Sequence, residues 1–279
     1  MSRPTLRVMT YNIRSCRGSD GRLDLDRVAE VIASFDPHLV GLQEVDRGRS
    51  RSRGCDQAAA LADRLGMAVR FACTIDRGGE LTGNATLTRL PVLAWREVRL
   101  PHSGRGFMSE PRCALVARLA WPAAAGSGPA RPLAFVNTHL STIRREQPAQ
   151  VTALSCALDG EEDAVVVGDL NCTPRSGNYR TLCARLRAAS RGARTWPALL
   201  PFMQLDHILF RGRLEVVRGG VWANRLARRA SDHLPVVAEL AARAPAGTIA
   251  CLPRAGVEGC WHGHDPQRTG LPGLRHRRH

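Results

Sequence analysis

The chain has 279 residues and a net charge of +15 at pH 7, and arginine supplies all forty of its basic side chains. Its apolar content suits one core-forming domain, but no run reaches the roughly 18 apolar residues that a membrane-spanning helix needs, and the N-terminus lacks the apolar segment of a signal peptide. The nine cysteines are irregularly spaced without a Cys-x-x-Cys pair, which is typical of a reducing compartment and not of a disulfide framework. We therefore expect a cytoplasmic protein, and we expect it to be a monomer.

The basic charge favours polyanionic partners without specifying a nucleic acid. The absence of lysine, together with abundant alanine and glycine, indicates codon bias and weakens the usual inference from a high pI. A basic surface attracts polyanions in general, including anionic lipid surfaces. Aromatic residues make up only 5% of the chain, which argues against binding of single strands through base stacking.

The N-terminal part predicts two strands and two amphipathic helices. Strands are expected over residues 6–11 and 39–43, from their apolar and β-branched content. A helix is expected over residues 24–35, and a second over residues 56–65, where Asp56 is the predicted N-cap. A basic loop rich in serine and glycine lies between the second strand and the second helix.

The rest of the chain predicts two strand-rich blocks with further helices. Helices are expected over residues 146–158 and 178–189, and residues 123–130 are expected to form a flexible hairpin tip. The expected strands cover residues 68–74, 85–88, 92–100, 114–119, 133–138, 164–167, 205–210, 215–221 and 234–240. This order predicts an α/β protein with two packed sheets flanked by helices.

The last residues have a different composition. Residues 245–279 are rich in glycine, proline, arginine and histidine and lack periodicity, so we expect one domain over residues 1–244 followed by a mostly disordered tail. The spacing of the cysteines and histidines in this tail matches no tetrahedral zinc pattern; these residues are Cys251, Cys260, His262 and His264.

Polar side chains follow the buried strand at residues 164–167. Asp169 and Asn171 are two residues apart, so on an extended backbone they point to the same side and offer a carboxylate beside an amide. Taken alone, this pattern is equally well explained by an Asx-rich turn.

Five other strand-like runs each carry a similar polar group at or near their ends. A lone group of this kind is usually a solvated cap, but open sheets gather their chemistry at strand ends. The five groups are Asn12, Glu44, His139, Asp206 and the Asp232-His233 pair. Together with Asp169, they predict a site that holds a metal and a phosphate.

These runs resemble, in order, the motifs of the endonuclease/exonuclease/phosphatase (DNase I-like) superfamily. The resemblance covers roughly residues 5–241, and its finer details are most similar to the small bacterial metal-dependent hydrolases of that group. The motifs are Thr10-Tyr11-Asn12, Gln43-Glu44-Val45-Asp46, Asn137-Thr138-His139-Leu140, Gly168-Asp169-Leu170-Asn171, Leu205-Asp206-His207-Ile208 and Ser231-Asp232-His233-Leu234-Pro235. The resemblance implies a four-layer α/β sandwich, with two mixed or antiparallel sheets and the site at one sheet edge.

The resemblance also implies a divalent metal, either Mg²⁺ or Mn²⁺, which prefers carboxylate and water ligands. Glu44 is the first expected ligand, and Asn12 would orient its carboxylate or a metal-bound water. Asp232 could contribute to a second metal position.

The expected catalytic groups follow from the same resemblance. Asp169 would activate the attacking water, and Asn171 would hold that water or the scissile phosphate. His233 would contact a phosphoryl oxygen, while Asp206 fixes its tautomer and favours the imidazolium. His139 would assist the leaving group, although a solvated loop histidine is the alternative.

Two substrate-binding residues are also expected. Asn84 lies in a Gly-Asn-Ala run where the superfamily often places a site residue. Arg112 could meet a substrate phosphate, or equally form a structural ion pair. His207 alternates to the other side of its strand from Asp206, so we interpret it as structural.

The predicted function is divalent-metal-dependent hydrolysis of a phosphodiester or phosphomonoester. A nuclease acting on DNA is the first alternative, but the short segment between Asp169 and Asp206 leaves little room for a DNA-binding insertion. A small or lipid-derived phosphoester is therefore favoured. The alternative of another class is a non-catalytic polyanion-binding module, which requires the loss of a ligand that this chain retains.

Overall fold

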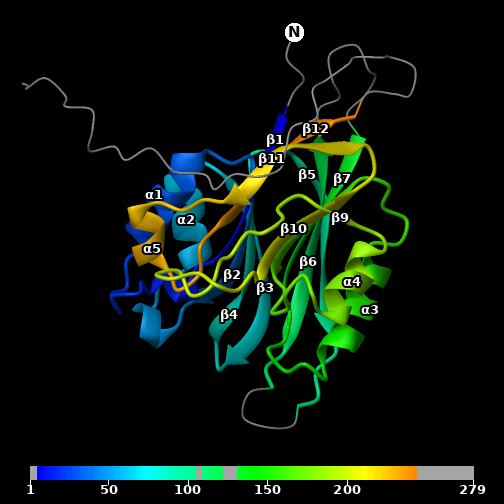
Figure 1. Ribbon diagram of the computed structural model, residues 1–279. Helices are drawn as coiled ribbons and strands as arrows, with labels where there is room; N and C mark the ends of the chain where they lie inside the picture. Colours follow the sequence, from blue (N-terminus) through cyan, green and yellow to red (C-terminus); the bar gives the residue numbers. More distant parts are fainter. Residues whose placement is uncertain (1–4, 105–108, 122–130, 244–279) are drawn as a thin grey trace, which may run out of the picture.

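Two six-stranded sheets pack face to face in the computed structural model, which describes residues 5–104, 109–121 and 131–243 (Figure 1). The first sheet has the order β11 (Leu214–Val221), β12 (Val236–Ala242), β1 (Thr5–Asn12), β2 (Leu39–Arg47), β4 (Glu80–Thr88) and β3 (Ala68–Arg77). The second has the order β5 (Val92–Leu100), β6 (Arg112–Trp121), β7 (Arg131–His139), β8 (Ala164–Asp169), β10 (Asp206–Arg211) and β9 (Arg187–Ala188).

Helices cover the outer faces of both sheets. On the first sheet lie α1 (Leu25–Phe35), α2 (Gln57–Leu65) and the short α5 (Arg225–Ala230), and on the second lie α3 (Gln147–Ala157) and α4 (Gly177–Cys183) (Figure 1). Single 3-10 turns occupy Arg14–Cys16 and Ser50–Ser52. The predicted four-layer α/β sandwich is therefore confirmed.

The first two helices, α1 and α2, begin directly after the capping aspartates at which they were predicted to start. The Asp24 side chain accepts a hydrogen bond from the backbone N–H of Arg27, and that of Asp56 accepts one from Ala59, so each carboxylate satisfies an otherwise free N–H of the first helical turn. Gly66 ends α2 with a φ of +60°.

One predicted helix is wrong in its second half. We expected residues 178–189 to be helical, but α4 ends at Cys183, and Ala188 pairs with Leu209 as part of the edge strand β9. Residues 187–188 there pair with the edge of β10 that would otherwise be exposed, and this long-range pairing outweighs the local helix propensity. Helix α5 was not predicted, since its six residues are too few to show a period.

A buried polar network ties the two sheets together beneath the strand ends. Gln43 on β2 donates from Nε2 to Asn137 Oδ1 on β7, at 2.7 Å, and to Thr10 Oγ1 on β1, at 3.1 Å. Asn137 Nδ2 in turn donates to the carbonyl oxygens of Leu42 and Ala85. A fully satisfied network of this kind fixes the relative position of the sheets.

No helix among the described residues is long and apolar enough to cross a membrane. The seven cysteines described by the structure are free thiols. The predicted hairpin tip at residues 123–130 and the tail at residues 245–279, with the domain boundary before it, lie outside the described residues.

Candidate active site

The polar groups expected at strand ends lie along one edge of the two sheets. Strands β1, β7 and β8 end at Asn12, His139 and Asp169, and β10 begins at Asp206, which pairs with Asp169. Because β7 and β8 are parallel and β10 is antiparallel to β8, these ends meet at the same edge. His233 lies just before β12, which runs antiparallel to β1 and therefore starts at this edge too.

Gly168 allows the close pairing that brings His139 opposite Asp169. A Cβ atom at this position would lie only 1.8 Å from the carbonyl oxygen of Thr138, and the φ of Gly168 is +152°. We expected this strand to end at residue 167, but β8 continues through Asp169. The glycine is required for close approach between strands.

Asp169 is a buried carboxylate held by hydrogen bonds. Its Oδ2 accepts from Asn12 Nδ2 at 3.2 Å, and its Oδ1 accepts from the backbone N–H of Asn171 at 3.0 Å. Burial, followed by the nearby Asp206 carboxylate, raises the pKa of Asp169 to about 7.

Asn171 reaches the site by a turn and not by an extended backbone. Its φ is +46°, and the hydrogen bond from its N–H to Asp169 closes an Asx turn, so the predicted same-side placement on a continuing strand is wrong. The side chain donates from Nδ2 to the carbonyl oxygen of Leu140 and lies 3.0 Å from His139 Nε2. The turn therefore places Asn171 between Asp169 and His139.

His233 and Asp206 form a buried pair. His233 Nδ1 lies 2.8 Å from Asp206 Oδ2, and its Nε2 lies 3.8 Å from Asp169 Oδ2. Burial alone would lower the pKa of His233, but the carboxylates of Asp206 and Asp169 raise it to about 10. The ring is therefore an imidazolium at neutral pH, with Nδ1–H donating to Asp206 and Nε2–H facing Asp169.

Unlike His233, His139 is uncharged at neutral pH, and the nearby charge of Arg112 helps to keep it so. Burial, then the charges of Arg112 and His233, lower the pKa of His139 well below its ordinary value, so the ring is neutral at pH 7. Arg112 Nη1 lies 3.1 Å from His139 Nδ1, and its Nη2 lies 3.2 Å from a Glu110 oxygen. Arg112 thus forms the anticipated ion pair and also touches a site histidine.

Glu44 is turned toward the site by an irregularity in β2. The register between β2 and β4 shifts between Leu42 and Val45, and Glu44 has a φ of +55°. Its Oε1 accepts from Asn12 Nδ2 at 2.9 Å, so one amide joins Glu44 to Asp169. We expected Glu44 to follow the strand, but it lies at a bulge within a strand that continues to Arg47.

Of the three remaining residues singled out from the sequence, only Asn84 lines the pocket; the other two are Asp232 and His207. Asp232 Oδ2 lies 3.6 Å from Arg14 Nε, and Asp232 is not among the described residues that line the pocket below. Asn84 lines the pocket while its Nδ2 donates to the carbonyl oxygen of Cys113. The buried His207 has its Nε2 2.9 Å from the carbonyl oxygen of Cys172, which fits the structural role expected for it.

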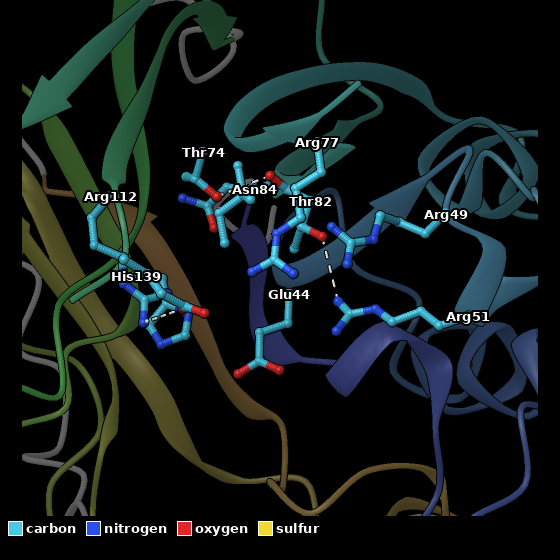
Figure 2. Close-up of a pocket in the computed structure, with 12 residues that line it drawn as sticks. Glu44, Arg49, Arg51, Thr74, Arg77, Thr82, Asn84, Arg112 and His139 are labelled. Atoms are coloured by element: carbon cyan, nitrogen blue, oxygen red, sulfur yellow. Dashed lines mark hydrogen bonds and ion pairs between the residues drawn. The ribbon is translucent and has the colours of Figure 1, made fainter. Parts of the chain in front are cut away.

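Several of these groups line a pocket with two connected lobes. The main lobe has a volume of about 650 Å³ and is lined by Asp169, Asn171 and His233 as well as by Trp196, Met203 and Leu205. The arginine lobe has a volume of about 180 Å³, and Arg49, Arg51, Arg77 and Arg112 are among its lining residues (Figure 2). Glu44, Arg112 and His139 line both lobes.

Sequence reasoning missed the apolar wall of the main lobe and Arg77. Trp196 and Met203 face each other through an isolated bridge in a loop without periodicity. Arg77 is one of forty arginines and lies next to a Gly-Gly turn. Only the position of the loop before the Leu205-Asp206-His207 motif could have suggested Trp196 and Met203, and no sequence signal marks Arg77.

The donor atoms fit a hard divalent cation. Among the described residues, Asp169, Asp206 and His233 bring potential ligand atoms within 4.8 Å of one another, and His233 Nδ1 and Asp206 Oδ2 are joined by a hydrogen bond. Glu44 and Asp169 offer carboxylate oxygen atoms at the pocket, and the Asn12 amide holds them together by donating from Nδ2 to both. Oxygen donors of this kind suit Mg²⁺ or Mn²⁺ better than a thiolate-preferring metal.

Comparison with known proteins agrees with this arrangement. The sequence profile of the Endonuclease/Exonuclease/phosphatase family matches residues 9–233. An endonuclease/exonuclease/phosphatase from Beutenbergia cavernae is 26% identical, with a TM-score of 0.70 over 87% of this chain and 72% of that chain. No curated protein sequence matches the chain.

Two further solved structures have the same fold at lower identity. The Bacteroides thetaiotaomicron mannosyl-6-phosphatase is 19% identical, with a TM-score of 0.66 over 84% of this chain and 99% of that chain. The catalytic domain of human Nocturnin is 21% identical, with a TM-score of 0.62 over 86% of this chain and 94% of that chain. The profile match extends over most of the chain, as the motifs predict, and this chain belongs to the endonuclease/exonuclease/phosphatase family.

Proposed function

We propose that this protein is a divalent-metal-dependent phosphoesterase that hydrolyses a small phosphomonoester or phosphodiester by in-line attack of an activated water. Membership of the family supports phosphoester hydrolysis as the reaction type. The observation that carries the proposal is the buried group of Asp169, Asp206 and His233, in which a carboxylate with a raised pKa lies 3.8 Å from an imidazole ring whose pKa is also raised.

Asp169 is the proposed general base. Its pKa of about 7 lets it take a proton from water near neutral pH, because a base works best when its pKa lies near the operating pH. Asn12 and the backbone of Asn171 hold its two oxygens in place, so the carboxylate is already oriented before the substrate arrives.

His233 is the proposed contact for a phosphoryl oxygen. His233 lines the main lobe with its Nε2 facing Asp169, and Asp206 maintains both the orientation and the charge of the ring. An imidazolium that is fixed in place stabilises the negative charge of the transition state without reorganising. Asp206 acts through His233 and is a positioning residue.

Asn171, His139 and Arg112 would complete the anion-binding side of the pocket. Asn171 offers an amide to the water or the phosphate, and Arg112 offers charge-assisted hydrogen bonds. His139 is neutral, so it can orient a ligand by hydrogen bonding, but it does not carry a spare proton for the leaving group at pH 7.

Glu44 and Asn12 would hold the metal, with Asp169 close to it. When bound, Mg²⁺ or Mn²⁺ supplies positive charge next to the phosphoryl oxygens. Asp232, which pairs with Arg14 instead, has a weaker claim to a second metal position.

The test is the hydrolysis of p-nitrophenyl phosphate and bis-p-nitrophenyl phosphate by the purified protein in Mg²⁺, in Mn²⁺ and in EDTA, beside His233→Ala. The proposal predicts turnover that EDTA abolishes and that His233→Ala lowers by about 10²–10³-fold. The preferred ester identifies the substrate class.

The alternatives predict other results. A nuclease would nick duplex DNA far faster than it turns over either ester. A polyanion-binding module would bind phosphate-rich ligands without turnover in any metal, and this result would overturn the proposal.

A further inference from the structure

Of the positive charge in the arginine lobe, only Arg112 has a part in the proposed reaction at Asp169. Four arginines line this lobe beside Thr74, Thr82 and Asn84, and the carboxylates Glu44 and Glu110 line it too. Arg49 and Arg51 come from the loop after β2, while Arg77 and Arg112 come from the end of β3 and the start of β6 (Figure 2). Four guanidinium groups around about 180 Å³ repel one another unless anions balance them.

Two of these arginines form close ion pairs with protein carboxylates. Arg51 makes two hydrogen bonds to the buried Asp46 carboxylate, at 2.7 and 2.8 Å. Arg112 pairs with Glu110. These two guanidinium groups are fixed in place on opposite sides of the lobe (Figure 2).

The other two have free donor capacity. The Arg49 side chain is 10% exposed and forms an ion pair with Glu80 at 3.6 Å, but its buried Nε makes no hydrogen bond to any described residue. Within the described part of the chain, Arg77 makes no ion pair, and Figure 2 shows its side chain extending into the pocket toward Glu44. A buried guanidinium without its full set of acceptors is costly, so an anion from outside the chain would stabilise this arrangement.

The arginine lobe opens directly onto the main lobe. Glu44, Arg77, Arg112 and His139 line both, so one ligand can occupy the two lobes together. We propose that the arginine lobe binds a second phosphate group of the substrate, and that the preferred substrate is a small ester carrying two phosphate groups. This inference rests on the proposed phosphoesterase function. Arginine suits the role because its planar donors match phosphate oxygens in pairs.

The kinetic test compares glucose 6-phosphate with glucose 1,6-bisphosphate by phosphate release in Mg²⁺. The bisphosphate should have a kcat/KM about tenfold higher in the native protein, and Arg77→Gln should remove most of that preference, because one charge-assisted contact is worth roughly a factor of ten. Arg77 is exposed, so its replacement should not impair folding.

The matched control is Arg53→Gln, an exposed arginine close to Arg49 that does not line the lobe. It should keep the native preference. An equal kcat/KM for the two esters in the native protein, or the same preference in Arg77→Gln, would overturn the inference.

A binding measurement separates this inference from the proposed function. Inorganic pyrophosphate is titrated into the native protein, Arg77→Gln and Arg53→Gln in EDTA by calorimetry. If neither sugar phosphate is hydrolysed, about tenfold weaker pyrophosphate binding in Arg77→Gln alone would support the arginine lobe while the phosphoesterase proposal fails. Equal affinity in all three proteins would overturn the arginine lobe.

Discussion

Asp169 and His233 lie at the same buried sheet edge. The surroundings of Asp169 favour its neutral form, whereas those of His233 favour its charged form. Burial and Asp206 work against a charge on Asp169, and Asp206 with Asp169 maintains the charge on His233. Perturbed titrating groups that face each other in a pocket are typical of catalytic sites. Because their pKa values differ from those in the unfolded chain, they also make the stability of the protein depend on pH, and each residue can be tested separately.

Asp169→Asn should stabilise the metal-free protein above about pH 4. The folded pKa of Asp169, about 7, exceeds that of an unfolded aspartate, so the unfolded state loses its proton first and the native protein loses stability as the pH rises from about 4 to 7. A neutral amide has no such penalty. Thermal unfolding in EDTA should therefore show a gap in Tm that widens over this range and stays constant above it.

The control is Asp159→Asn, which removes an exposed carboxylate paired with Arg185. Its Tm should follow that of the native protein at every pH. A constant Tm difference between Asp169→Asn and the native protein from pH 4 to 8 would contradict a raised pKa for Asp169.

Asp206→Asn should lower the pKa of His233 from about 10 toward the ordinary value of about 6.5. The native ring then stays charged from pH 6 to 8, whereas the variant loses its proton over that range. NMR titration of the His233 ring in EDTA measures this directly. The ratio of Asp206→Asn turnover to native turnover should also fall between pH 6 and pH 8. If Asp206 had a purely structural role, this ratio would be the same at the two pH values.

At the level of the strands, the site depends on how closely β7 and β8 approach. Gly168→Ala would place a methyl group against the Thr138 carbonyl and should cost roughly 2–4 kcal/mol of the free energy of unfolding, measured with urea. Gly177→Ala is the control, because a Cβ there meets no atom within 4 Å and the residue begins α4. It should change stability by less than about 1 kcal/mol. Equal effects of the two substitutions would show that close strand approach is not what Gly168 provides.

The strands that carry the site were predictable because their sequences are locally consistent. The run at residues 164–167 is β-branched and buried, and the helices that begin at Leu25 and Gln57 are preceded by capping aspartates. The motif residues at the ends of these elements were therefore identifiable before their positions in space were known. The Asp206–His233 hydrogen bond was expected only from the family resemblance, since it joins two strands through the tertiary fold.

Other features could not be predicted because they arise from long-range contacts. The bulge at Glu44 reflects the register between β2 and β4, and the early end of α4 reflects the need to pair the β10 edge. The hydrogen bond between Arg112 and His139 brings together two strands whose side chains give no local sign of it. Local patterns carry no information about such pairings.

Across the whole molecule, the two sheets each supply part of the site. Asn12 and Glu44 belong to the first sheet, and His139, Asp169 and Asp206 belong to the second. The buried hydrogen bond from Gln43 to Asn137 holds the two sheets together below the pocket. The proposed metal and catalytic groups therefore come together only when both sheets are folded and packed.

The most direct test is the turnover number for bis-p-nitrophenyl phosphate at saturating Mg²⁺ in the native protein, Asp169→Asn and Asp159→Asn. If Asp169 is the general base, Asp169→Asn should lower turnover by about 10²–10⁴-fold while remaining folded, and Asp159→Asn should match the native protein. Native-like turnover by Asp169→Asn would contradict the proposed mechanism.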